Sequence, residues 1–228
     1  MRQLQRVVDE AIGILPGPTT EEKKPYDISK IDFDRLKQEF ERSFTKNTTV
    51  QNLRQAVESR LQRLLSQNPL RTDFQRHYEK IVEEYNREKD QMTIEQTFEA
   101  LLNLVQALND EERRAIREGL DEESLAIFDL LKKPDLKEAD IKRIKKIAVN
   151  LLNTLKEEKL QVDQWRDKET TRDAVRVAIR NFLWSDDTGL PVDLYTEDDV
   201  DHKAEDVFRH VFWAYPILPS PYYEAVTA

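Results

Sequence analysis

Residues 141–155 read IKRIKKIAVNLLNTL, and this stretch predicts the fold class. Its apolar residues recur at every third or fourth position, at Ile141, Ile144, Ala148, Leu151 and Leu155. That spacing is typical of one face of an α-helix, whereas a strand would alternate apolar and polar side chains. Charged and polar residues fill most of the positions between, so one face can be buried while the other is solvated. The stretch therefore predicts a long amphipathic helix.

The same spacing continues on both sides of this helix. The further apolar stripes are Phe33/Leu36/Phe40/Phe44, Val50/Leu53/Val57/Leu61/Leu64, Phe74/Tyr78/Ile81/Tyr85, Ile94/Phe98/Leu101/Val105/Leu108, Leu125/Phe128/Leu131, Val175/Ile179/Phe182/Leu183 and Val200/Ala204/Val207/Phe208/Val211/Tyr215. No stretch has convincing strand alternation, and no internal repeat is present. We therefore expect an all-α protein of roughly nine amphipathic helices. They would pack as one elongated domain or as two helical lobes.

Polar residues predict where several of these helices begin. Asn109, with Glu112 three residues later, has the form of a capping box and predicts a short helix that ends at Gly119. Asp121 and Thr196 each precede an apolar stripe, and their side-chain oxygens can accept hydrogen bonds from a first helical turn. The prolines fall between the stripes, as the missing N–H of proline requires.

Stripes and prolines together divide the chain into four segments. The expected segments are residues 1–25 (the end of an upstream helix, Leu4 to Leu15, and a flexible linker over residues 16–25), 26–119 (an N-terminal helical lobe), 120–215 (a C-terminal helical lobe) and 216–228 (a tail). The linker prediction rests on prolines, a glycine and charges with little apolar surface to bury.

Composition limits the classes of function. The chain has 228 residues, of which 36% are charged against roughly 25% in an average globular protein, and its net charge is −9. Contact with DNA would therefore need a local basic patch. Cysteine is absent, and no stretch has the form of a signal peptide or a membrane span, so we expect a cytoplasmic protein.

Only four glycines occur, and none are clustered. A loop that binds ATP or a dinucleotide needs clustered glycines so that backbone N–H groups can approach phosphate. Val7–Ala11 resembles a helicase motif, but the buried strand and phosphate loop that such a motif needs are missing from this sequence. We therefore expect no catalytic residue, no cofactor-binding residue and no cofactor in this chain.

Two carboxylate patterns bear on metal binding. Pro134-Asp135 with Glu157-Glu158-Lys159 formally matches a nuclease pattern, but the helix between them should hold the pairs far apart. Residues 198–206 form an acidic cluster in the first turns of a predicted helix, where the helix dipole favours acids. His77, His202 and His210 lack the spacing of metal ligands on one helix face. We assign no metal ligand, although a magnesium or calcium site at the acidic cluster stays open.

Basic residues supply one set of candidate binding residues. Lys142, Arg143, Lys145 and Lys146 fall opposite the apolar stripe of the predicted long helix. A solvated helix face and a contact with the DNA backbone are both compatible with this pattern.

Arginines and tryptophans supply a second set. Arg172, Arg176 and Arg180 follow one side of a helix, and Arg172 projects into its apolar arc. A buried guanidinium needs a partner, so an internal ion pair and a protein interface both remain open. Trp184 and Trp213 point away from the apolar arcs of their helices. A tryptophan in this position often packs on a neighbouring element, and when it is exposed it is a typical interface anchor.

Several motifs, in order, resemble one known family. They are residues 119–131 (GLDEESLAIFDLL), Ile144–Ala148 with Leu151-Leu152, Trp165–Glu169 followed by Arg172 and Arg176, and the upstream segments 52–65 and 74–85. Over about residues 26–215 the chain is similar to the C-terminal helical region of the R (HsdR) subunit of type I restriction–modification enzymes. The resemblance adds Trp165 to the candidate interface residues.

The resemblance implies a parent enzyme that translocates DNA with ATP and magnesium and cuts it far from its recognition site. In that family the nuclease and motor domains precede this region, and their motifs are not in this sequence. By analogy the region docks the R subunit onto the methyltransferase core. The implied partners are the modification and specificity subunits and the rest of the R subunit. DNA is a further candidate, and no membrane is implied. A DNA-backbone-binding module is the alternative function, and an unrelated helical adaptor or metal-dependent enzyme is a third.

Overall fold

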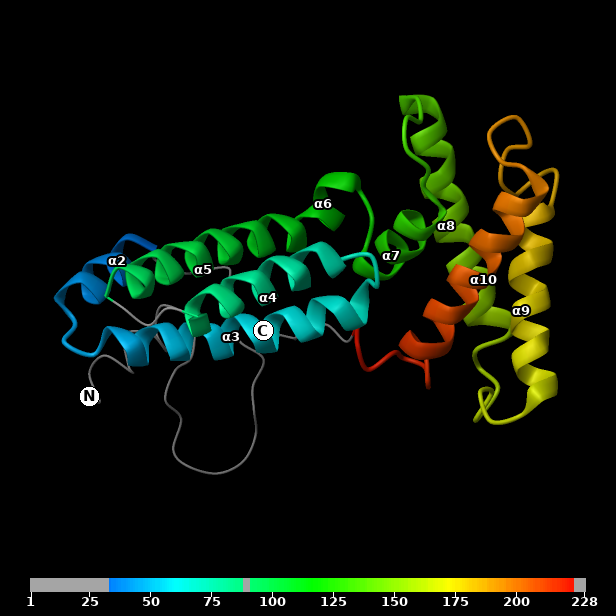
Figure 1. The fold of residues 1–228 in the computed structure, drawn as a ribbon. Coiled ribbons are helices and arrows are strands. Elements are labelled where there is room, and N and C mark those ends of the chain that lie inside the picture. Colours follow the sequence, from blue (N-terminus) through cyan, green and yellow to red (C-terminus); the bar gives the residue numbers. More distant parts are fainter. Residues whose placement is uncertain (1–32, 88–90, 224–228) are drawn as a thin grey trace. The chain divides into compact units, whose positions relative to one another are not determined.

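The computed structural model describes residues 33–87 and 91–223 (Figure 1). The predicted upstream helix, the linker over residues 16–25 and the Val7–Ala11 motif lie outside the described residues. Within the described ranges no helix is both long enough and apolar enough to cross a membrane.

The described residues confirm the all-α prediction, because they form helices and turns without a β-strand. The helices are α2 (Phe33–Arg42), α3 (Lys46–Gln67), α4 (Thr72–Arg87), α5 (Gln91–Glu112), α6 (Arg114–Glu118), α7 (Glu122–Leu131), α8 (Glu138–Glu158), α9 (Glu169–Trp184) and α10 (Glu197–Ala214). Apart from Phe44 and Tyr215, the residues of the apolar stripes read from the sequence lie on these helices.

The chain separates into two compact units. Among the described residues, those up to Arg63 and those within Arg71–Arg113 form the first unit, and Leu64–Leu70 joins the described residues from Arg114 onward in the second. The last turn of α3 and the turn that follows it therefore belong to the second unit.

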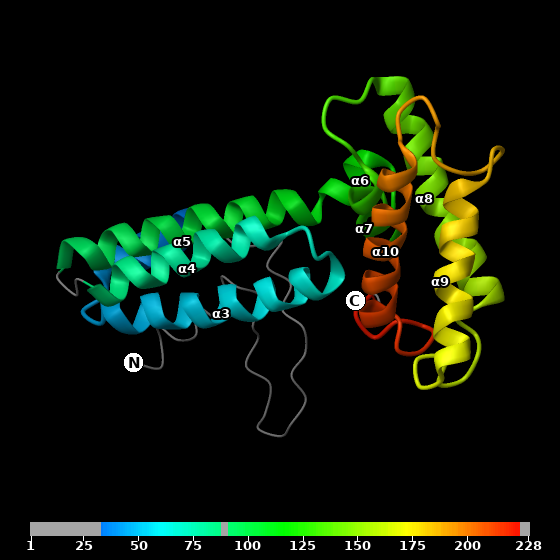
Figure 2. The same ribbon diagram turned by 45° about the vertical axis from the view of Figure 1, so that its right-hand side comes forward.

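In the first unit, α3, α4 and α5 run side by side (Figures 1 and 2). The stripes of α3 and α5 are buried, from Val50 to Leu61 and from Ile94 to Leu108, and the rings of Phe40 and Phe98 stack with centroids 3.8 Å apart. Arg60 lies in this interior with only 1% of its side chain exposed. It donates two hydrogen bonds to the Glu112 carboxylate, at 3.0 and 2.7 Å. Burial raises the pKa of Glu112, but Arg60 and Arg63 outweigh it and hold that pKa below the ordinary value.

In the second unit, α7 is buried on nearly every side and packs against α8 and α10, while α9 packs against α10 and α8. A helix with apolar residues around its whole circumference is expected in such a position. Trp165, Phe128 and Tyr215 are among the largest buried side chains of this core. The Trp165 Nε1–H donates to the carbonyl oxygen of Tyr215 at 2.9 Å, so the buried ring keeps a hydrogen-bond partner.

Two predicted helix starts are confirmed. The carboxylate of Asp121 accepts from the backbone N–H of Ser124 at the start of α7. Thr196 caps α10 in a capping box with Asp199. Gly119 ends α6 with φ of +69°, and the N–H groups of Gly119 and Leu120 donate to the carbonyls of Ile116 and Ala115. This pattern is a Schellman motif, which favours glycine at that position.

Two sequence predictions about helix extent are wrong. Asn109 does not begin a helix, because α5 continues through it to Glu112, whose carboxylate pairs with Arg60 rather than with a backbone N–H. Phe44 does not extend the stripe of α2, because that helix ends at Arg42 and the Phe44 side chain is fully exposed in the turn before α3.

Candidate functional site

The arginine stripe of α9 meets the acidic cluster of α10. Arg180 donates from Nε and Nη2 to both carboxylate oxygens of Asp201, at 2.8 and 3.1 Å. Arg176 pairs with Glu205 at 3.2 Å, and its guanidinium lies 4.2 Å from the ring centre of Phe208. The Trp184 Nε1–H also donates to Asp201. These ion pairs join two neighbouring helices of one unit, and they are exposed enough that each contributes little to stability.

Arg172 and Trp165 occupy different surroundings from the rest of the candidate interface set. Arg172 is half-buried, and its Nη1 donates to the backbone carbonyl of Arg166 at 3.2 Å, so its partner is a carbonyl rather than a carboxylate. Trp165 is 1% exposed and belongs to the core, which removes it from the candidate interface residues. Trp184 and Trp213 are 37% and 67% exposed and point away from the core, as the helical wheel predicts.

The four basic residues of α8 divide into two kinds. Lys145 is internal to the unit, because its ammonium bonds to the carboxylate and to the backbone carbonyl of Glu118, each at 2.7 Å. Lys142 pairs with Glu138 on the exposed surface of the same helix at 3.0 Å. Arg143 and Lys146 are exposed on α8. Lys142, Arg143 and Lys146 are therefore the members of this set that remain open to solvent.

Carboxylates of the acidic cluster at the start of α10 form hydrogen bonds and ion pairs with neighbouring groups. Lys133 donates to Asp199 at 2.6 Å, and this bond, followed by the capping bonds from Thr196, holds the pKa of Asp199 well below its usual range. Lys203 donates to the carbonyl of Leu130 at 2.5 Å. Among the described residues, no three histidine, aspartate or glutamate side chains gather as a set of metal ligands.

The two halves of the nuclease-like pattern lie at opposite ends of α8. Asp135 precedes the helix in a turn with φ of +61°, while Glu157 and Glu158 form its last residues. A helix of 21 residues separates its ends by about 30 Å, at 1.5 Å per residue. These carboxylates cannot share a metal ion in this fold.

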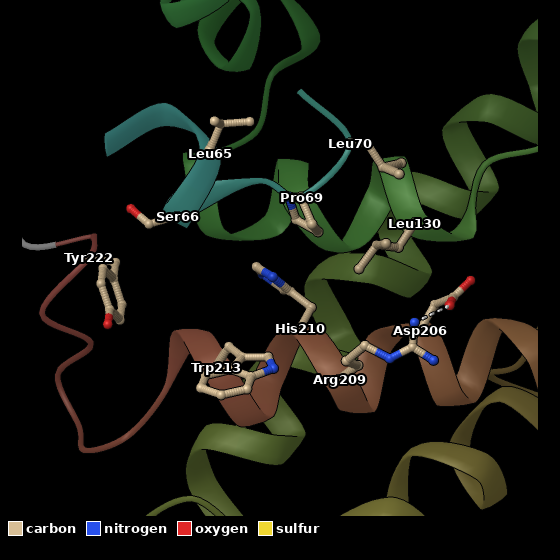
Figure 3. A pocket seen from close by; sticks show the side chains of 10 residues that line it. All are labelled: Leu65, Ser66, Pro69, Leu70, Leu130, Asp206, Arg209, His210, Trp213 and Tyr222. Carbon is tan, nitrogen blue, oxygen red and sulfur yellow. Dashed lines mark ion pairs between the residues drawn. The ribbon is translucent and has the colours of Figure 1, made fainter. Parts of the chain in front are cut away.

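A groove opens beside α10 in the second unit (Figure 3). Its volume is about 500 Å³. One side of α10 forms a wall, because Asp206, Arg209, His210 and Trp213 are spaced three and four residues apart. The remaining lining residues are Leu65, Ser66, Pro69, Leu70, Leu130 and Tyr222. In Figure 3 the imidazole of His210 points from α10 toward Ser66 and Pro69, with Trp213 and Tyr222 bordering the same space.

Hydrogen bonds hold the walls of this groove together. The Nε2 of His210 lies 3.0 Å from the Tyr223 hydroxyl, and that hydroxyl donates to the carbonyl of Gln67. The side-chain amide of Gln67 in turn donates to the carbonyl of Tyr222 at 2.9 Å. Burial lowers the pKa of His210 to about 4, so the ring is neutral at neutral pH. The segment after α10 is thereby fastened to the end of α3.

Comparison with protein families decides the identity of the chain. Residues 9–211 match the family described as type I restriction enzyme HindI endonuclease subunit-like, C-terminal. The chain belongs to this family. The match confirms the resemblance to the C-terminal region of the endonuclease (R) subunit, and it includes residues of both units but ends before Trp213 and Tyr222 of the groove. No curated protein and no solved structure matches the chain.

Sequence reasoning missed the groove of this C-terminal domain. Leu70, His210 and Tyr222 line it, yet they come from segments about 140 residues apart in the chain. One signal could have drawn attention to the site. His210 falls within the buried stripe of α10, next to Val211 and three residues after Val207, where a polar ring needs a partner.

Proposed function

We propose that this C-terminal domain joins the R subunit to the methyltransferase core and takes no part in catalysis. Its partners are then the modification and specificity subunits and the rest of the R subunit, in the cytoplasm, while ATP and magnesium serve the rest of the R subunit. The observation that carries the proposal is the groove of the second unit, because exposed apolar side chains gather around it. Apolar patches of this kind mark protein interaction sites.

Two further observations support a role without catalysis. Phosphoryl transfer needs a phosphate cradle, a lysine and a magnesium carboxylate in one place, and the four glycines of this chain are too scattered to build the cradle. The carboxylates that formally match a nuclease pattern are held apart by the length of α8. Arg176, Arg180 and Lys145 are engaged in ion pairs between helices of one unit.

The test is direct binding. The purified 228-residue chain should bind the cognate methyltransferase complex in isothermal titration calorimetry, because a specific interface buries enough surface to release measurable heat. The same chain should neither hydrolyse ATP nor cleave DNA when magnesium and the methyltransferase are present. The proposal is wrong if the chain gives no binding heat and no pull-down with that complex, or if it hydrolyses ATP on its own.

A second candidate function is contact with the DNA backbone. Lys142, Arg143 and Lys146 are exposed along α8, and lysine and arginine are the usual partners of phosphate oxygens. If this function applies, the chain should bind duplex DNA of unrelated sequences equally well. The affinity should fall steeply with salt, and neutralising Arg143 and Lys146 together should flatten that slope by about two phosphate contacts. DNA binding of this kind, without methyltransferase binding, would favour the second candidate.

A further inference from the structure

Three exposed large apolar side chains of the second unit border the groove, while others, such as Ile116 and Val192, do not line it. Trp213 is 67% exposed, Leu70 is 53% exposed and Tyr222 is 42% exposed, and all three border the same hollow. Single apolar residues on a surface are ordinary, but several around one hollow indicate a binding site. A tryptophan can remove up to about 250 Å² from water when it is covered, which makes Trp213 the strongest anchor in the groove.

The walls of the groove are already in place before a partner arrives. Besides the His210–Tyr223–Gln67 bonds, the side chain of Asn68 donates to Asp129 at 2.6 Å and accepts from the backbone N–H of Leu70 at 3.0 Å. Ser220 donates to the carbonyl of Ala214 and fixes the segment that carries Tyr222. A surface that is ordered before binding loses less entropy when it binds, so more of its burial energy becomes affinity.

The charge at the rim of the groove favours an acidic group. Arg209 and Asp206 form a long ion pair of 3.8 Å on the surface, with 64% of the arginine side chain exposed. Such a pair contributes little and is easily replaced. Asp206 also interacts electrostatically with the ammonium of Lys203. The guanidinium of Arg209 therefore has donors available to a carboxylate, which it can bind in bidentate geometry.

We propose that the groove binds an amphipathic helical segment of the methyltransferase core, with an apolar side chain in the hollow and a carboxylate on Arg209. The proposal rests on the assembly function above and adds the surface and the chemistry of the partner. The wall from Asp206 to Trp213 is about 10 Å long, so about two turns of a partner helix could lie along it. A helix that lies in an apolar groove is a common mode of recognition, with anchors spaced three and four residues apart.

The experiment compares variants of the 228-residue chain in calorimetric titrations against the cognate methyltransferase complex. Trp213→Ala should weaken binding at least about tenfold, because buried tryptophans dominate interfaces. Arg209→Glu should weaken it about tenfold, because it places a negative charge against the partner's carboxylate. Val177→Ala is the matched control, since this valine is 53% exposed on α9 and does not line the groove, and it should bind within about twofold of wild type. Thermal unfolding and circular dichroism of each variant report whether the fold is kept.

The possible results separate this inference from the assembly function. If the wild-type chain fails to bind the complex, the assembly function is wrong and the groove inference falls with it. If the wild type binds but Trp213→Ala and Arg209→Glu bind equally well, the groove inference alone is overturned. Tighter binding by Arg209→Glu would overturn the acidic partner. Self-association in sedimentation that Trp213→Ala abolishes would identify a second copy of the chain as the occupant, which also overturns the inference.

Discussion

At the residue scale, His210 is the buried group whose charge state matters most in the groove. Its Nε2 faces the Tyr223 hydroxyl, while Asp206 and Arg209 of the same helix line the groove beside it. The Tyr223 hydroxyl gives its proton to Gln67, so it accepts the hydrogen bond from the imidazole Nε2–H. A neutral imidazole satisfies this arrangement, whereas protonation would place a charge in a buried site.

His210 predicts a pH dependence of stability. Burial lowers its folded-state pKa to about 4, against about 6.5 in the unfolded chain, so the unfolded state binds a proton first as the pH falls. The stabilisation is therefore complete above about pH 6.5 and is lost progressively toward pH 4, by up to about 3 kcal/mol. Urea unfolding between pH 7 and pH 5 should show this decline, and His210→Gln, which does not titrate, should show a much smaller one. Equal slopes for both proteins would contradict the burial of a neutral ring.

The arginines of α9 show which features a helical wheel can predict and which it cannot. The wheel predicts that Arg176 and Arg180 share one side of the helix, but not that Glu205 and Asp201 of α10 lie opposite them. Those partners depend on which helices become neighbours, which is a property of the tertiary fold. The wheel also predicts that Arg172 needs a partner. That partner is the backbone carbonyl of Arg166. Because every residue has a backbone carbonyl, side-chain patterns cannot indicate which one will be the partner.

At the scale of single elements, the end of α9 depends on Gly189. The N–H of Gly189 donates to the carbonyl of Ser185 at 2.8 Å, and the N–H of Leu190 donates to that of Leu183 at 2.9 Å. A Cβ atom on Gly189 would lie 2.5 Å from the Ser185 carbonyl oxygen and closer still to that of Leu183. Both neighbours are backbone atoms of the helix end, so they cannot rotate away as a flexible side chain would.

Gly189→Ala should therefore lower the free energy of unfolding by about 2–3 kcal/mol, since overpacking forces the backbone to shift. Gly119→Ala is the matched control, because Gly119 has φ of +69° but nothing within 4 Å of an added Cβ. Gly119→Ala should lower the free energy of unfolding by only about 1 kcal/mol, which is the cost of placing an alanine in the left-handed conformation. Urea denaturation of the two variants measures the difference. If Gly189→Ala lowers the free energy of unfolding no more than Gly119→Ala does, the inference that this turn is closely packed is wrong.

Helix positions were largely predictable from the sequence, whereas the helix boundaries near Phe44 and Asn109 were not. The apolar stripe from Ile94 to Leu108 is enough to predict α5, because its period matches the 3.6 residues per turn of an α-helix. Asn109 and Glu112 have a capping pattern that is locally reasonable. In the folded chain Glu112 is held by Arg60 of α3, about fifty residues away, so a long-range ion pair overrides the local signal.

At the scale of the whole molecule, the groove could not be predicted from the sequence. The stripe that starts at Val50 continues through Leu64, and no pattern indicates that Leu64–Leu70 packs with the second unit rather than the first. The segment that carries Tyr222 returns to Gln67 through hydrogen bonds that involve a backbone carbonyl. The sequence does predict that Trp213 points away from the apolar arc of its helix, and the fold then leaves it exposed at the edge of the groove.

The central claim is that this C-terminal domain attaches the R subunit to the methyltransferase core. The most direct test deletes it from the parent R subunit, which is then mixed with the purified modification and specificity subunits and analysed by size-exclusion chromatography and sedimentation. We predict that the truncated R subunit stays folded but elutes separately from the intact methyltransferase, because the interface would be lost with the domain. The full-length R subunit should elute together with the methyltransferase. The contrary result is a truncated subunit that assembles normally while its affinity for DNA collapses, which would replace the assembly function with a DNA-binding one.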